Sequence, residues 1–239
     1  MQTIFAIGDI HGQIDMLHRA LETIAKDADA GAPVVFLGDY VDRGPDSRAV
    51  LDLLMQGQAD GLPWTVLKGN HDRYMTRFLG DADYRDANTT KNYHWLDAPI
   101  GGRKTLASYG VDVDDRRSHA DIQADAREAV PQSHVDYIEG LPLMHVTDDQ
   151  IFVHAGIRPG VALDDQVEDD LIWIRKGWLE DERDHGRLVV HGHTALETPQ
   201  HHGNRLNLDG GAGYGRPLLP ARLVGRDAWV LNAFGRARL

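Results

Sequence analysis

The chain has 239 residues, contains no cysteine and carries a formal net charge of −12 at pH 7. Its length suits one large domain, so we predict a single domain over residues 1–239. The absence of cysteine excludes disulfide bonds, zinc–thiolate sites and thiol nucleophiles. The acidic balance disfavours binding to nucleic acid or to an anionic membrane. We find no signal-peptide pattern and no apolar run near the ~18 residues of a membrane span, so we expect a cytoplasmic protein.

Six short apolar runs predict buried β-strands. They are "TIFAIGD" (3–9), "PVVFLGD" (33–39), "WTVLKGN" (64–70), "QIFVHAG" (150–156), "RLVVHGH" (187–193) and "NRLNLDG" (204–210). Helical periodicity falls between several of these runs, which indicates an α/β fold with largely parallel pairing. Residues 76–150 are rich in charge and helical patterns, and we predict a helical insertion there, beside the site.

Polar clusters follow these strands, at the edge where α/β sheets bind their ligands. Glycine, aspartate and asparagine are ordinary turn residues, but turn chemistry does not require histidine. Four of the six clusters nevertheless contain a histidine. We therefore expect one shared functional site at the strand ends.

The residue types in these clusters predict a metal centre. Asp9 and His11 lie two residues apart, so in an extended segment their side chains point the same way. Carboxylate, imidazole and amide ligands suit Mn²⁺, Fe²⁺ or Zn²⁺ better than Ca²⁺. The clusters offer more ligands than one ion requires, which favours two divalent ions that share a bridging carboxylate. Such a site stays positive and attracts a phosphate dianion.

Three motifs carry a resemblance to a known family. "GDIHG", "GDYVDRG" and "GNHD", in this order and followed by His154 and "GHT", resemble the calcineurin-like metallophosphoesterases. Within that superfamily they are most similar to the phosphoprotein phosphatase branch, especially its bacterial and phage serine/threonine phosphatases. The resemblance implies two packed mixed β-sheets flanked by helices, in a four-layer sandwich. It places Asp9, His11 and Asp39 on a first metal ion, and Asp39, Asn70, His154 and His193 on a second.

Some positions depart from the pattern or fall outside it. Ala195 stands where much of the wider superfamily has a second histidine, which argues against the cyclic nucleotide phosphodiesterase branch. Asp72 replaces the glutamate of eukaryotic members, which leaves its partner open. His191 matches no ligand position, and we interpret it as a supporting or packing residue. Asn207 and Asp209 are assigned structural roles near the site.

The predicted reaction is direct attack on phosphorus by a metal-bridging hydroxide. Arg43, in "DRG", would clamp the phosphoryl group together with the two ions. The resemblance implies that His71 is the general acid, that Asp42 supports its charged form, and that Arg175 is a second clamp. We predict a metal-dependent phosphomonoester hydrolase, a protein serine/threonine phosphatase with Mn²⁺ as the expected metal. Its substrate would be a phosphorylated protein or a small phosphoester.

Two alternatives stay open. A symmetric dinucleoside tetraphosphate hydrolase needs the same metals, and would differ in the insertion and around Trp95, "GGRKTLASYG" and Trp173. "GGRK" could bind an extra phosphate, although a solvated basic loop is the favoured interpretation. The non-enzyme alternative is a metal-binding scaffold without turnover. The sequence does not exclude phosphotyrosine as a substrate.

Overall fold

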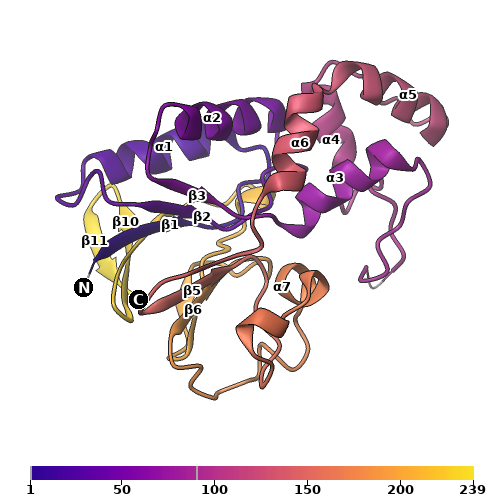
Figure 1. Ribbon diagram of the computed structural model, residues 1–239. Helices are drawn as coiled ribbons and strands as arrows, with labels where there is room; N and C mark the ends of the chain where they lie inside the picture. Colours follow the sequence, from indigo (N-terminus) through magenta and orange to yellow (C-terminus); the bar gives the residue numbers. More distant parts are fainter. Residues whose placement is uncertain (1, 90) are drawn as a thin grey trace.

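The computed structural model describes residues 2–89 and 91–239. Two β-sheets pack against each other, and helices cover their outer faces (Figure 1). The layers follow the order helices, first sheet, second sheet and helix, which confirms the predicted α/β fold of two packed mixed sheets.

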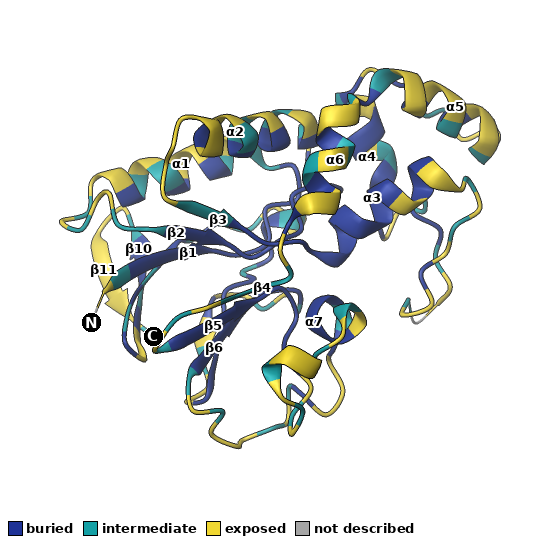
Figure 2. Ribbon diagram, in the orientation of Figure 1, coloured by how far each residue is buried: buried dark blue, intermediate teal, exposed yellow. Residues whose placement is uncertain are grey.

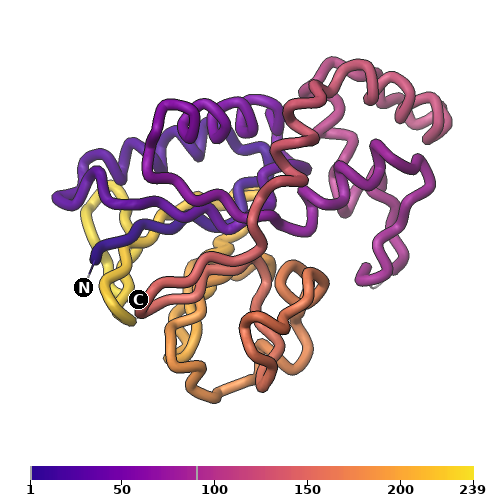
Figure 3. Tube along the Cα trace, in the orientation of Figure 1, coloured from indigo at the N-terminus to yellow at the C-terminus, as the bar shows by residue number. Residues whose placement is uncertain are grey.

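The first sheet has the strand order β11-β10-β9-β1-β2-β3. Its parallel half consists of β1 (Thr3–Ile7), β2 (Val34–Phe36) and β3 (Trp64–Val66). Its antiparallel half consists of β9 (Ala221–Val224), β10 (Asp227–Asn232) and β11 (Gly235–Arg238). The last part of the chain thus returns beside the first strand, as the yellow and indigo segments of the trace show (Figure 3).

The second sheet has the order β4-β5-β6-β8-β7. Its strands are β4 (Met144–Val146), β5 (Gln150–Val153), β6 (Leu188–His191), β7 (Gln200–His201) and β8 (Arg205–Asn207). β5, β6 and β8 run parallel, whereas β4 and β7 pair antiparallel at the edges. Parallel pairing therefore holds among the six predicted strands only, and the five other strands make both sheets mixed.

The helices divide between the layers. On the outer face of the first sheet lie α1 (Ile14–Ala25) and α2 (Ser47–Ala59). Beyond its strand ends lie α3 (Asn70–Gly80), α4 (Gly102–Ser108), α5 (His119–Ala129) and α6 (Gln132–Gly140). The second sheet is covered by α7 (Glu168–Trp173), and two short 3₁₀ turns are η1 (Leu163–Asp165) and η2 (Ala212–Tyr214). The predicted insertion at 76–150 contains the end of α3 and all of α4, α5 and α6, but residues 81–89 and 91–101 form turns and irregular backbone, and β4 near its end belongs to the second sheet.

Three clusters of buried apolar side chains hold the layers together (Figure 2). One lies between the sheets, where Ala6 and Leu37 of the first meet Phe152 and Val190 of the second. The largest joins the outer face of the first sheet to α1–α6, and the third joins the second sheet to α7. The central strands β1, β2, β5 and β6 are buried on both faces, and the polar clusters follow their ends. In the described part of the chain, no helix has the length and apolar character that crossing a membrane requires.

Candidate active site

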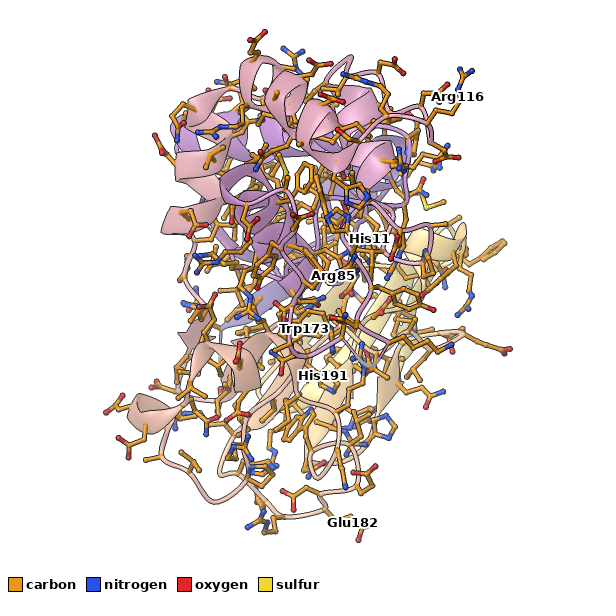
Figure 4. The ribbon with its side chains drawn as sticks, turned by 90° about the vertical axis from the view of Figure 1, so that its right-hand side faces the viewer. His11, Arg85, Arg116, Trp173, Glu182 and His191 are labelled. Carbon is orange, nitrogen blue, oxygen red and sulfur yellow. The ribbon has the colours of Figure 1, made fainter. Side chains whose placement is uncertain are left out.

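The strand ends of both sheets bring the predicted residues together. In the first sheet, β1 is followed by Asp9 and His11, and β2 is followed by Asp39, Asp42 and Arg43. Helix α3, after β3, begins with Asn70 and His71. In the second sheet, β5 is followed by His154 and β6 by His193. The six predicted metal ligands are buried, with at most 7% of any residue exposed. In Figure 4 the labelled His11 lies above the labelled Trp173, where the upper and lower halves of the view meet.

Two groups of potential ligand atoms share one carboxylate. His11, Asp39 and His71 offer ligand atoms within 4.8 Å of one another, and so do Asp39, His154 and His193. Asp39 belongs to both groups, so its position is suited to a carboxylate that bridges two cations. The first group contains His71, which the sequence did not predict as a ligand, and does not contain Asp9, which it did.

The second group has a donor set that fits a cation. His154 Nδ1 donates to Leu37 O at 2.8 Å, so Nε2 of the neutral ring carries a lone pair. This Nε2 lies 2.9 Å from Asn70 Oδ1, and His193 Nδ1 lies 2.8 Å from the same oxygen. His193 Nε2 is buried without a hydrogen-bond partner among the described residues. Acceptor atoms this close together require a shared proton or a cation, so these residues fit a divalent ion.

The charges of the site favour the same conclusion. Burial alone would lower the pKa of His154, but the carboxylates of Asp39 and Asp9 raise that pKa to about 9. Burial alone would raise the pKa of Asp39, but the imidazoles of His154, His71 and His11 hold it well below its usual range. Positive charge next to these carboxylates is therefore stabilised, whether a proton or a metal ion supplies it.

The first group also faces a positive charge. His11 Nδ1 donates to Val41 O at 2.8 Å, and its Nε2 accepts from Arg43 Nη1 at 2.7 Å. Burial and the Arg43 guanidinium lower the pKa of His11 well below its usual value, so the ring is neutral. His11 Nε2 lies 3.7 Å from Asp39 Oδ2. A cation bound beside Asp39 at this position would take the place of the Arg43 N–H as the partner of Nε2.

His71 and Asp42 form a tightly bonded pair. His71 Nδ1 lies 2.6 Å from Asp42 Oδ2, and His71 Nε2 lies 3.0 Å from Arg43 Nη2. The Asp42 carboxylate is completely buried and also accepts from Trp95 Nε1 at 3.0 Å and Thr105 Oγ1 at 2.7 Å. These bonds fix the ring so that Nε2 faces the cavity. The sequence marked Trp95 only as a groove residue, and it gave no signal for Thr105.

Backbone strain gathers at the same place. Six non-glycine residues of the described chain have positive φ: His11 (50°), Asp39 (57°), Asp42 (77°), Arg43 (64°), Asn92 (52°) and His193 (66°). All but Asn92 are predicted site residues. A left-handed conformation costs about 1–3 kcal/mol and persists only where surrounding contacts enforce it, typically at functional sites.

Two glycines leave room for the carboxylates. An ideal Cβ on Gly192 would lie 2.0 Å from Asp9 Oδ1, and one on Gly69 would lie 2.2 Å from Asp39 Oδ1. The Asp9 carboxylate is held by His193 N, which lies 3.1 Å from both of its oxygens. Any larger residue at 69 or 192 would displace a proposed ligand.

The structure identifies the surroundings of three residues whose roles the sequence left open. Arg175 lines the cavity and donates from Nη2 to His193 O at 3.2 Å, and burial lowers its pKa. His191 is fully buried, packs edge-on against Trp178 and has a pKa lowered by burial to about 3, as a packing residue would. Asp72 accepts backbone N–H groups of two neighbouring loops, which identifies its partners.

These side chains surround a cavity of about 340 Å³. Its lining residues are Asp39, Arg43, Asn70, His71, Asn88, Thr89, Tyr93, Ile100, Trp173, Arg175, His193, Thr194, Ala195, Asp209 and Tyr214. "GGRK" does not line it: Arg103 donates to Leu96 O and Val113 O and pairs with Asp115 at 3.3 Å. The basic side chain of Arg103 is thus engaged elsewhere, which argues against a phosphate site at "GGRK". The segment is the start of helix α4 and both of its glycines are buried, so the solvated loop expected from the sequence is wrong.

Comparison with known proteins assigns a family. A family model described as calcineurin-like phosphoesterase matches residues 2–214. The bis(5′-nucleosyl)-tetraphosphatase PrpE (asymmetrical) of Geobacillus thermodenitrificans is 27% identical over 241 residues, which cover 90% of this chain and 88% of that protein. The protein of the same name from Bacillus cereus is 23% identical, with the same coverage.

Solved structures share the fold at lower identity. A putative diadenosine tetraphosphatase has a TM-score of 0.68 at 22% identity, covering 96% of this chain and 93% of that one. A cold-active protein-tyrosine phosphatase of a psychrophilic Shewanella species has a TM-score of 0.64 at 18% identity, with coverage of 100% and 80%. A serine/threonine phosphatase from Saccharomyces cerevisiae has a TM-score of 0.53 at 17% identity, with coverage of 99% and 76%. Since the family model covers most of the chain, the resemblance is confirmed and the protein belongs to the calcineurin-like phosphoesterase family.

Proposed function

We propose that the protein is a metal-dependent phosphomonoester hydrolase that removes phosphate from serine and threonine residues of proteins. The observation that carries the proposal is that His71, Asp42 and Arg43 adjoin the proposed metal ligands in one cluster. Family membership supports hydrolysis of a phosphoester, and the choice of substrate is our proposal.

The cavity would hold two divalent ions, for which we propose Mn²⁺, with iron and zinc as alternatives. The resemblance assigns Asp9, His11 and Asp39 to the first ion, and of these His11 and Asp39 belong to one group of close ligand atoms. The second ion would be bound by Asp39, Asn70, His154 and His193. When bound, the ions would lower the pKa of water to supply a hydroxide nucleophile and would neutralise charge on the phosphoryl group.

Arg43 and Arg175 would bind the phosphoryl oxygens. Both line the cavity, and the Arg43 guanidinium presents Nη1 to His11 and Nη2 to His71. The two nitrogens form a fork that matches two oxygens of one phosphate. On binding substrate, Arg43 would exchange its contacts with the imidazoles for contacts with phosphate.

His71 would donate the proton that the leaving alkoxide of serine or threonine requires. Its Nδ1 is held by Asp42, so a proton on Nε2 would face the cavity, and the carboxylate would stabilise the charged ring. Trp95 and Thr105 orient that carboxylate by donating to it. General acid catalysis of this kind contributes about 10²–10⁴ in rate.

Leaving groups of different basicity test this role. We expect His71→Asn to lose about 10²–10⁴ in rate on an alkyl phosphate and far less on an aryl phosphate, whose phenolate leaves with little help. Asp42→Asn, which keeps its shape but loses its charge, should show the same difference. Equal losses on both substrates would mean that His71 is not the general acid.

Metal content tests the bridging carboxylate. Wild-type protein loaded with Mn²⁺ should contain two equivalents by elemental analysis, and Asp39→Asn should lose at least one of them, because Asp39 belongs to both groups of ligand atoms. Two retained equivalents would refute Asp39 as the bridge.

Dinucleoside tetraphosphate hydrolysis is a second candidate. The aromatic side chains of Tyr93, Trp173 and Tyr214 line the cavity, and Tyr214 is 61% exposed, so nucleobases could stack there. The names of the curated relatives point the same way. Rates on a phosphopeptide and on diadenosine tetraphosphate would separate the two candidates. Two ADP as products would indicate the symmetrical reaction that the sequence left open as an alternative, whereas AMP and ATP would indicate the asymmetrical one.

Turnover of p-nitrophenyl phosphate with and without Mn²⁺ separates an enzyme from a metal-binding scaffold. No turnover with any divalent ion would favour the scaffold. A cytoplasmic location and the absence of nucleic acid or membrane partners remain predictions from the sequence.

A further inference from the structure

Asp209 is a buried carboxylate of the cavity to which the mechanism above gives no role. It follows β8, is 5% exposed and lines the cavity together with Asp39. An ideal Cβ on Gly192 would lie 2.0 Å from Asp9 Oδ1 and 3.8 Å from Asp209 Cβ. Asp9 and Asp209 therefore both approach the same glycine, on the side of the cavity where the first cation would be bound.

The surrounding backbone fixes Asp209 but satisfies only one of its carboxylate oxygens. Its N–H donates to Asn207 Oδ1 at 2.9 Å, and its carbonyl accepts from Leu196 N at 2.9 Å. Oδ1 accepts from Gly211 N at 2.9 Å, whereas Oδ2 has no hydrogen-bond partner within residues 2–89 and 91–239. One oxygen of a rigidly held carboxylate is thus available for another contact.

The positions of the charges call for a cation close to Asp209. Asp9, Asp39 and Asp209 are each at most 5% exposed, and the Cβ position of Gly192 lies within 3.8 Å of both Asp9 Oδ1 and Asp209 Cβ. Three like charges in a buried cluster repel one another unless a cation lies among them.

The proposed donor sets are also unequal. The resemblance assigns the first ion the three ligands Asp9, His11 and Asp39, whereas it assigns the second ion the four ligands Asp39, Asn70, His154 and His193. Ala195 lines the same cavity and offers no donor atom. The first ion therefore has one proposed ligand fewer than the second, and a further carboxylate oxygen would make the two coordination shells equal.

We propose that Asp209 is a positioning residue for the first cation, which its carboxylate holds in place together with Asp9. The inference rests on the proposed function, since it assumes that the cavity binds two divalent ions. The competing explanation is structural, namely that Asp209 serves only to accept the Gly211 N–H and stabilise a turn.

The substitution Asp209→Asn separates these explanations, because asparagine keeps an oxygen for Gly211 and loses the charge. Calorimetric titration of the metal-free protein with Mn²⁺ should show one of the two sites weakened by about 10–100-fold and the other unchanged. Without metal, the variant should melt at the same temperature as the wild type or higher, since repulsion with Asp9 is removed. The exposed Asp165→Asn makes the same change in net charge and should leave both affinities unchanged.

Two results would overturn the inference. One is wild-type affinity of Asp209→Asn for both ions. The other is a lower melting temperature of the metal-free variant, which would assign Asp209 a structural role. If the wild-type protein itself binds fewer than two Mn²⁺ ions, the proposed metal centre fails first, and this inference fails with it.

Discussion

Asp72 connects two loops that carry proposed metal ligands, and its removal should be strongly destabilising. Its carboxylate is completely buried. Oδ2 accepts from Asp39 N and Gly69 N, and Oδ1 accepts from Tyr40 N, each at 2.9 Å. Burial, together with the charge of Asp39, raises the pKa of Asp72 to about 6, so the carboxylate is still ionised above neutral pH.

The cost follows from the hydrogen bonds that are lost. Asp72→Ala leaves three buried N–H groups without an acceptor, and each such group costs about 1–3 kcal/mol. We therefore expect the free energy of unfolding to fall by at least about 3 kcal/mol. Asp72→Asn retains one carbonyl oxygen, which can still accept, so its loss should be smaller.

Urea denaturation of the metal-free proteins above neutral pH measures both losses, with equal denaturant slopes as the check for two-state unfolding. A loss below about 1 kcal/mol for Asp72→Ala would refute the reasoning, because even one buried N–H group without an acceptor costs about that much. So would an Asp72→Asn variant as unstable as Asp72→Ala, since the number of acceptors would then not matter.

Two further predictions concern the metal site. Gly192→Ala should displace the Asp9 carboxylate and weaken Mn²⁺ binding at least about tenfold by calorimetry. The control Gly80→Ala, whose Cβ meets open space, should bind Mn²⁺ as the wild type does. Equal affinities of the two variants would contradict the assignment of Asp9 as a metal ligand. The pKa of His154 is raised from 6.5 to about 9, so protonation of His154 stabilises the metal-free fold. This stabilisation is fully present below pH 6.5 and is lost as the pH rises through about 9. Over the same interval Mn²⁺ affinity should increase, since the proton competes with the cation, and binding that is independent of pH would argue against His154 as a ligand.

The sequence predicted those strands whose own residues show a pattern, namely an apolar run followed by a polar cluster. β1, β2, β5 and β6 are mostly apolar and buried, β3 and β8 are shorter runs with apolar residues, and each of the six is followed by a recognisable polar cluster. β11 gives no such signal because all four of its residues are exposed, and the two-residue β7 is too short to show a period. These strands form only because a neighbouring strand offers hydrogen bonds.

The same distinction applies to the candidate site. Asp9 and His11 could be read together because they lie two residues apart. Two of the three partners of Asp72 could not, since they are backbone groups of residues 39 and 40, more than 30 positions away. Backbone amides are present at every position, so no sequence pattern marks the ones that a carboxylate will bind.

The helical insertion takes part in holding the proposed catalytic loop. The left-handed conformations of Asp42 and Arg43, with φ of 77° and 64°, are unfavourable for a free chain. Asp42 N donates to Thr105 Oγ1 at 2.8 Å, and Arg43 N donates to Gly101 O at 3.4 Å. Since Trp95 also donates to the Asp42 carboxylate, residues 95–105 contact both the proposed acid pair and the proposed phosphate clamp. A change in that segment should therefore alter the positions of Asp42 and Arg43 together, although neither residue belongs to the insertion.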